Sequence, residues 1–182
     1  MARRASARIT ASEKTEDPFG TIVGKRAFFN AISTLEDMEF DGDTDLREAV
    51  IGTPNMGTND GLSVIISDFF SDEDWKKAVD YLCYKKRQVL LVQVLTPEEV
   101  DPSYTGRVHL IDIETESVED DRNMKIKIDR ASQMAYQQAM DDIRGELKTF
   151  CHSRGVDYVQ LCTDQPVEKA LFKELLKVGI MA

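Results

Sequence analysis

The stretch GLSVIISDFFSDEDW, residues 61–75, contains a continuous apolar and β-branched run that ends at Asp68. A run of this kind is typical of a strand that is buried on both faces of a parallel sheet. The apolar residues after it recur at helical spacing, and Ser71 and Asp74 form an approximate capping box at the start of this segment. The stretch therefore predicts a strand followed by a helix, with a carboxylate between them. The predicted inward residues of the helix are Trp75, Ala78, Val79 and Leu82.

Two more apolar runs predict parallel strands, at QVLLVQVL (residues 88–95) and DYVQLCT (residues 157–163). The order strand, helix, strand indicates a right-handed βαβ unit. Residues 107–129 predict an inserted antiparallel β-hairpin, because apolar and polar residues alternate in MKIKID and an acidic loop precedes it. The expected fold class is α/β, with three layers and a mostly parallel sheet.

Helical spacing of apolar residues predicts three further helices. The first lies within residues 25–38, the second is long and ends before Gly155, and the third begins near Pro166. We expect residues 1–182 to form a single domain. The predicted inward residues of the three helices are Phe28, Phe29, Ile32 and Leu35; Tyr136, Met140, Ile143, Leu147 and Phe150; and Val167, Leu171, Leu175 and Val178.

The composition limits the classes of partner. The chain has 182 residues and a formal net charge of −10, which argues against binding to nucleic acid or to anionic lipid, because both need a positive field. No apolar run approaches the roughly 20 residues that a membrane span needs. Three well-separated cysteines indicate free thiols in a reducing compartment, so a cytoplasmic location is expected.

Asp68 lies where ligands bind in open parallel sheets, outside the carboxyl end of a strand. Three roles are open for its carboxylate from position alone. It can bind a hard cation, it can act as a nucleophile or base, or it can accept backbone N–H groups at the start of the next helix.

The acidic loop GDTDL, residues 42–46, offers one hydroxyl and two carboxylates. The hydroxyl of Thr44 together with an Asp carboxylate suits Mg²⁺, which prefers oxygen ligands and keeps several waters. The structural alternative is that Asp43 or Thr44 caps a short helix that begins near Leu46. Either acidic segment alone is a weak signal, and the two together in one α/β chain are more specific.

Four segments resemble one bacterial family, the domain of unknown function 58 family. They are GDTDLREAV, VIISDFF, KKRQVLLVQVLTPEEVDPSYTGRVHLIDIE and AYQQAMDDIRGELKTFCHSRGVDYVQLCTDQPVEKAL. The similarity extends from about residue 24 to the end of the sequence, and the last segment is the most specific. The resemblance implies a Rossmann-like domain of the von Willebrand factor A type.

The resemblance also implies a metal-ion-dependent adhesion site. In the family pattern, a Thr in a Gly-x-Thr-Asp-Leu loop and an Asp after a strand supply ligands, and these positions are Thr44 and Asp68 here. The expected cofactor is Mg²⁺. Family members are commonly linked with MoxR-type AAA+ ATPases, so the expected function is a non-enzymatic interaction module or adaptor with such an ATPase as its partner.

The chain departs from the family pattern at the first ligand loop. The family carries an Asp-x-Ser-x-Ser motif after its central first strand, and no such motif occurs here. We therefore expect an N-terminally truncated domain with weak or no Mg²⁺ binding. A missing central strand exposes backbone groups and apolar faces such as that of residues 62–69. The chain is thus expected to pair through an open sheet edge, and a second copy is one candidate.

Two alternative functions remain open. One is a magnesium-dependent phosphoryl-handling enzyme that uses Asp68, and the other is a metal-free scaffold that dimerises through the open sheet edge. An enzyme is the less favoured interpretation, because the two histidines, His109 and His152, form no recognisable Ser–His–Asp or Cys–His pattern.

Overall fold

The computed structural model describes residues 9–10, 15–16, 22–37, 46–51, 61–70, 74–102, 106–110 and 124–177. The chain divides into two compact units. Unit 1 comprises Met1–Met56 and Ile113–Val118, and unit 2 comprises Gly57–Asp112 and Glu119–Ala182.

Unit 1 contains two short antiparallel strands and two helices in its described residues. In the first helix Ala31 is buried, whereas Phe28 and Phe29 are exposed, so its predicted inward face is wrong at these two residues. The two rings instead pack edge to face against each other, with centroids 5.8 Å apart. The elements of unit 1 are β1 (Ile9–Thr10), β2 (Thr15–Glu16), α1 (Lys25–Glu36) and α2 (Leu46–Ile51).

Unit 2 is built on a three-stranded parallel sheet. β4 (Gln88–Leu95) lies between β3 (Leu62–Ser67) and β7 (Asp157–Cys162), and both pairings are parallel. α3 (Asp74–Tyr84) connects β3 to β4. These findings confirm the three predicted parallel strands and an α/β fold.

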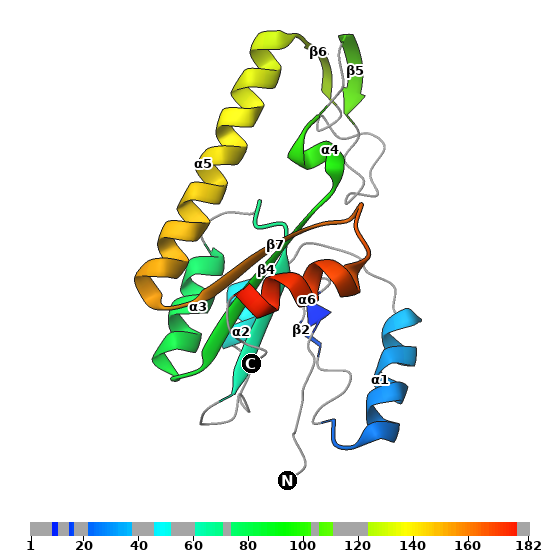
Figure 1. Cartoon of the computed structure of the whole chain (residues 1–182), viewed down its shortest axis with the longest axis vertical. Coiled ribbons are helices and arrows are strands. Elements are labelled where there is room, and N and C mark those ends of the chain that lie inside the picture. The colour runs from blue at the N-terminus through cyan, green and yellow to red at the C-terminus, as the bar shows by residue number, and fades with distance from the viewer. Residues whose placement is uncertain are drawn as a thin grey trace. The chain divides into compact units, whose positions relative to one another are not determined.

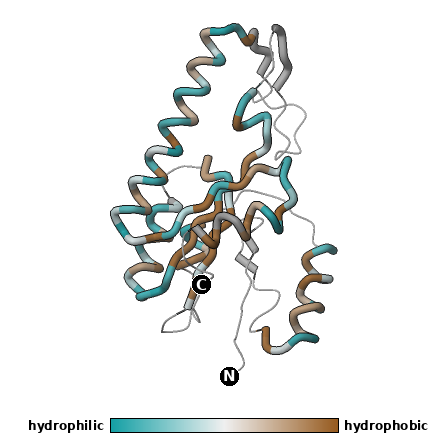
Figure 2. The backbone as a smooth tube through the Cα atoms, in the orientation of Figure 1, coloured by the Kyte–Doolittle hydropathy of each residue, from teal (hydrophilic) through white to brown (hydrophobic). Residues whose placement is uncertain are grey.

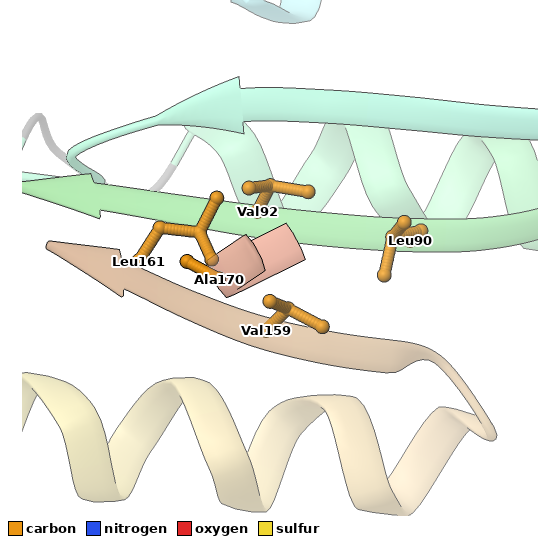
Figure 3. Packing of buried hydrophobic residues seen from close by; sticks show 5 residues of the cluster. All are labelled: Leu90, Val92, Val159, Leu161 and Ala170. Carbon is orange, nitrogen blue, oxygen red and sulfur yellow. The ribbon is translucent and has the colours of Figure 1, made fainter. Parts of the chain in front are cut away.

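Helices cover both faces of this sheet (Figure 1). α3 and α5 (Arg130–Arg154) lie on one side, and α6 (Val167–Lys177) lies on the other. Figure 2 shows that the strands between them are largely hydrophobic. The cluster beneath α6, drawn in Figure 3, consists of Leu90, Val92, Val159, Leu161 and Ala170. Side chains that are fully buried elsewhere in unit 2 include Val79, Leu82, Leu91, Leu95 and Leu147.

The predicted inward faces of the helices in unit 2 are confirmed in large part. All four predicted residues of α3 are buried, as are Met140 and Leu147 of α5. Val167 was predicted to face inward but is 59% exposed, because it is the first residue of α6 and precedes the turn that packs on the sheet. Val178 and the capping residue Ser71 lie outside the described residues.

The prediction that β3 is buried on both faces is wrong. Among the described strands, β3 lies at the edge of its sheet, and Ile65 is its only buried residue. Three apolar side chains on the opposite face are exposed: Leu62 (42%), Val64 (48%) and Ile66 (67%). Burial depends on what packs against a strand as well as on the strand's composition, and the described helices leave this face open. The exposed apolar face expected for residues 62–69 is therefore observed.

A second, separate pair of strands lies between β4 and α5 in the sequence. β5 (Gly106–Leu110) pairs antiparallel with β6 (Met124–Ile128). A short helix that the sequence analysis did not predict, α4 (Pro97–Val100), precedes them. It starts with a complete capping box, in which Thr96 and Glu99 each bind the other's backbone N–H.

α5 has a defined beginning and end. The side chain of Asp129 accepts a hydrogen bond from the Ser132 N–H at 2.9 Å, which satisfies one of the free donors at the helix start. Gly155 ends the helix in the left-handed conformation, with φ 65°, as the sequence predicted. No helix within the described ranges is both long and apolar enough to span a bilayer.

Candidate functional site

Asp68 follows the last residue of β3, and its side chain is exposed. This is the carboxyl end of a parallel strand, which is the predicted position. The chain then turns at Phe69, whose backbone has a positive φ of 60° and whose side chain is only 3% exposed. The turn therefore directs a carboxylate toward solvent and the next side chain into the core.

Hydrogen bonds fix one oxygen of the Asp68 carboxylate. Oδ1 accepts from the Phe70 N–H at 3.0 Å and from the Ser67 hydroxyl at 3.4 Å. The Ser67 Oγ in turn accepts from the Phe69 N–H at 3.1 Å. Part of the predicted capping role is thus observed, although the bonded N–H lies before α3 and not within it. The hydrogen bonds that the described residues make to this carboxylate are both at Oδ1.

Aromatic packing holds the turn against α3 and α5. Phe69 packs edge to face on Trp75, with ring centroids 5.6 Å apart, and Trp75 packs in the same way on Phe150 at 4.8 Å. A left-handed conformation costs a residue with a Cβ about 1–2 kcal/mol. Burial of an aromatic ring, at about 1.5–3 kcal/mol, and each ring pair, at about 0.5–1.5 kcal/mol, offset that cost. The strained turn is therefore a stable feature of unit 2.

A buried side chain also binds the backbone of Asp68. The Nε2 of Gln93 donates to the Asp68 carbonyl at 2.9 Å, and Gln93 is completely buried in β4. Its Oε1 accepts from the Tyr158 hydroxyl at 2.6 Å. Burial raises the pKa of Tyr158 to about 12, against the opposing charge of Arg144, so this hydroxyl keeps its proton at neutral pH. The sequence analysis missed both residues; a polar Gln93 flanked by apolar residues in β4 is a local signal, but it does not identify the partners of this side chain.

The second predicted ligand, Thr44, lies outside the described residues. Its convergence with Asp68 therefore remains a prediction, as does the alternative that Thr44 or Asp43 caps α2. Within the described ranges, no three His, Cys, Asp or Glu side chains come together as a metal site. Asp68 fits Mg²⁺ as one exposed oxygen ligand, whereas a full octahedral shell needs six.

A shallow groove lies between α3 and α5 in unit 2. Its volume is about 500 Å³, and its charged lining residues include Lys76, Asp80, Glu146 and Arg154. Lys76 pairs with Glu146 and Arg154 pairs with Asp80. Because these charges neutralise each other, the groove has little electrostatic preference for a ligand.

The three cysteines are free thiols, as predicted. Cys151 is buried, whereas Cys83 and Cys162 are half-buried. Burial raises the pKa of Cys151 to about 11, and nearby Cys83 adds to the shift. A thiol with this pKa is a poor nucleophile at neutral pH, so Cys151 is suited to packing.

Residues 3–146 match the profile of a family described as protein of unknown function DUF58. The matched range includes most of the segments on which the resemblance was based, together with Thr44 and Asp68. No curated protein matches the sequence.

Two solved structures are similar over most of the chain. One is an aerotolerance-related membrane protein from Bacteroides fragilis NCTC 9343 with multiple mutations to serines, at 13% identity and a TM-score of 0.49, covering 96% of this chain and 79% of that one. The other is the conserved hypothetical protein BatB from Bacteroides thetaiotaomicron, at 16% identity and a TM-score of 0.48, covering 98% and 80%.

Proposed function

Since the chain belongs to the DUF58 family, we propose that it is a non-enzymatic protein-interaction module whose contact surface is the open edge of β3 and the carboxylate of Asp68. The observation that carries this proposal is the exposure of an uncharged apolar edge strand that ends at an exposed carboxylate. An apolar patch beside polar groups is a common mark of an interaction site.

Among the described residues, the edge of β3 lacks the usual protection. Natural edge strands are guarded by charged side chains, proline or bulges, and LSVIIS contains none of these. The Gln88 N–H binds the Gly61 carbonyl at 3.1 Å, so odd-numbered residues direct their backbone groups toward β4. The backbone groups of Val64 and Ile66 therefore face the open edge, where an extended partner segment would bind them.

The guanidinium of Arg87 limits this surface at its amino end. Its Nη2 donates to the Leu62 carbonyl at 3.2 Å, and its Nε donates to the Ser63 hydroxyl at 2.6 Å. The remaining open edge runs from Val64 to the strand end. The proposed contact surface is therefore adjacent to Asp68.

Mg²⁺ is the proposed cofactor, and Thr44 and Asp68 are the residues that would hold it. Asp68 suits this role because Oδ1 is fixed by hydrogen bonds while the side chain is exposed. The cation would supply positive charge and open coordination positions for an acidic group of the partner. With so few ligands from this chain, we expect weak binding in the absence of a partner.

A MoxR-type AAA+ ATPase in the cytoplasm is the proposed partner, on the basis of the family resemblance. The test is binding of a purified ATPase of this type to the immobilised full chain, measured by biolayer interferometry in Mg²⁺ and in chelator. We expect Asp68→Ala to weaken binding about tenfold or more, as for a central charged contact. Asp142→Ala is the matched control, since Asp142 is exposed on α5 and accepts a hydrogen bond from the Gln138 side chain.

Equal affinity of the wild type and Asp68→Ala would refute the assigned contact. A magnesium-dependent phosphatase activity that Asp68→Asn abolishes would refute the non-enzymatic assignment, because it is the result expected of a phosphoryl-handling enzyme.

The open edge favours a second candidate function, a metal-free scaffold that dimerises through β3. Light scattering would then detect a dimer that chelator does not dissociate. We expect Ile66→Lys to produce a monomer, because it places a charge on the open edge. Phe172→Lys, which changes an equally apolar residue of α6 that is 54% exposed, should leave the dimer intact. A monomeric wild type would exclude this candidate.

A further inference from the structure

We propose that Gln93 and Tyr158 are positioning residues for Asp68, a role that rests on the proposed function of this carboxylate as the contact group. They hold the backbone of the turn through the completely buried side chain of Gln93 and the half-buried side chain of Tyr158. Gln93 is the residue that carries this inference, since a completely buried polar side chain costs several kcal/mol unless it is hydrogen-bonded.

The chemistry of the partners fixes the orientation of the Gln93 amide. A backbone carbonyl only accepts hydrogen bonds, so the amide NH₂ must face the Asp68 carbonyl. The amide oxygen is then left for the Tyr158 hydroxyl, which must donate. The three groups therefore form a chain of two hydrogen bonds, here called the relay, which runs from the Tyr158 hydroxyl of β7 through the Gln93 amide of β4 to the Asp68 carbonyl at the end of β3.

The hydrogen bond from Gln93 to Asp68 lies where the backbone hydrogen bonding between β3 and β4 ends. Ser67 is the last residue of β3 in the parallel register, and its partner in β4 is Gln93. The next carbonyl, that of Asp68, has passed the end of the ladder, and the Gln93 side chain binds it instead. In effect, Gln93 extends the hydrogen bonding of the sheet by one residue through its side chain.

Both ends of the peptide unit between Asp68 and Phe69 are thereby held. Its carbonyl binds Gln93, and its N–H binds the Ser67 hydroxyl at 3.1 Å. Without the Gln93 bond, rotation of this peptide unit would relieve the positive φ of Phe69, which L-residues with a Cβ disfavour. That rotation would also move the Asp68 carboxylate away from the Phe70 N–H, to which it is bonded.

The consequence for recognition is a pre-organised carboxylate. A contact group that is already ordered loses less conformational entropy on binding, and so binds more tightly. Outer residues that orient a ligand group typically change affinity by about 10–100-fold when they are mutated. Gln93 and Tyr158 would act in this way on Asp68, at a distance from the bound partner or cation.

The first arm of the test needs no ligand. Amide hydrogen exchange of Phe69 and Phe70 is compared by NMR in the wild type, Gln93→Leu and Tyr158→Phe. We expect Gln93→Leu to speed exchange at both amides by about tenfold, the effect of losing roughly one net hydrogen bond. Tyr158→Phe should have a smaller effect, because the Gln93 bond to Asp68 remains. Unchanged exchange in Gln93→Leu would overturn the inference.

The second arm measures Mn²⁺ binding by the paramagnetic broadening of the same amide signals, a method that detects weak binding. We expect Asp68→Ala to abolish site-specific broadening and Gln93→Leu to weaken binding about tenfold. Gln160→Leu is the matched control, because Gln160 is the partner of Gln93 in β7 and is half-buried outside the relay.

The two arms separate failure of this inference from failure of the proposed function. If Asp68→Ala leaves broadening unchanged, or the wild type shows none, the metal role of Asp68 is wrong and the exchange arm alone judges the relay. If Asp68→Ala abolishes broadening but Gln93→Leu binds Mn²⁺ like the wild type, the positioning role is wrong. Far-ultraviolet circular dichroism establishes that each variant is folded.

Discussion

Replacing Tyr158 with Phe removes one hydroxyl from the interior of unit 2 and leaves the ring in place. That hydroxyl donates to the Gln93 Oε1 at 2.6 Å. In the variant, a completely buried amide oxygen loses this donor, and no other described residue donates to it. The change therefore tests the buried relay with little disturbance of packing.

The expected cost follows from this geometry. A buried acceptor that loses its donor destabilises a protein by about 1–3 kcal/mol. Gln93→Leu alone leaves the Asp68 carbonyl and the Tyr158 hydroxyl without their partner, with a similar cost. In the double variant Gln93→Leu/Tyr158→Phe, two apolar side chains face each other and only the Asp68 carbonyl is left. The two effects should therefore be less than additive, with a coupling energy of about 1–2 kcal/mol.

Urea unfolding, followed by the fluorescence of Trp75, measures these effects. Trp75 is the single tryptophan of the chain and is buried in unit 2, so its emission reports the unfolding of this unit. With a slope of about 1.5 kcal/mol/M, within the usual range for urea, a loss of 1.5 kcal/mol lowers the midpoint by about 1 M. Strictly additive free energies in the cycle would refute the relay, since independent sites do not couple.

Three further predictions concern unit 2. The folded-state pKa of Tyr158 is raised to about 12 by burial, with Arg144 lowering it and Cys151 raising it, above the ordinary value near 10. The protonated phenol therefore stabilises the fold below about pH 10, and this contribution is lost as the pH rises through about 12. Absorbance at 295 nm should show a late-titrating component that Tyr158→Phe removes, in addition to the component from Tyr136, whose pKa is also raised by burial. Cys151, with its pKa raised to about 11 mainly by burial, should react more slowly with a thiol reagent at pH 8 than half-buried Cys83, and mass spectrometry showing equal rates would contradict its burial. Trp75→Ala should lower the free energy of unfolding by about 3–5 kcal/mol, because Trp75 is 4% exposed and packs on the rings of Phe69 and Phe150. Urea unfolding followed by circular dichroism measures this change. A loss below about 1 kcal/mol would show that the aromatic packing does not hold the turn at Phe69.

Local sequence patterns predicted the strands and helices of unit 2 well. β3, β4 and β7 correspond to largely apolar runs, and α3 to apolar residues at helical spacing. These features depend on residues that are close in the sequence. The short helix α4 was missed although Thr96 and Glu99 form a capping box, a signal that is also local and was readable in the sequence.

The exposure of β3 required information beyond local pattern. Its apolar run resembles that of β4, yet Ile66 is 67% exposed whereas Leu91 in β4 is fully buried. The difference arises because helices cover β4 on both faces, whereas the described helices leave one face of β3 open. Composition predicts that a segment is a strand, whereas its neighbours decide how much of it is buried.

The candidate site was likewise predictable only in part from the local sequence. The position of Asp68 at a strand end was predicted, because the end of an apolar run marks the end of a strand. The bond from Gln93 to the Asp68 carbonyl joins residues 25 positions apart, so it depends on the register of β3 and β4. No pattern within either strand specifies that register, and the role of Gln93 could be found only from the fold.

The parallel sheet has a consequence for the synthesis of this protein. β4 can pair with β3 soon after both leave the ribosome, but its other edge must wait for β7, since Tyr158 lies 65 residues after Gln93 in the chain. At typical rates of translation this delay is roughly 3 to 13 s. During that time the apolar side chains of β4 lack their final cover, so chaperones that bind nascent hydrophobic segments should recognise the chain at this stage.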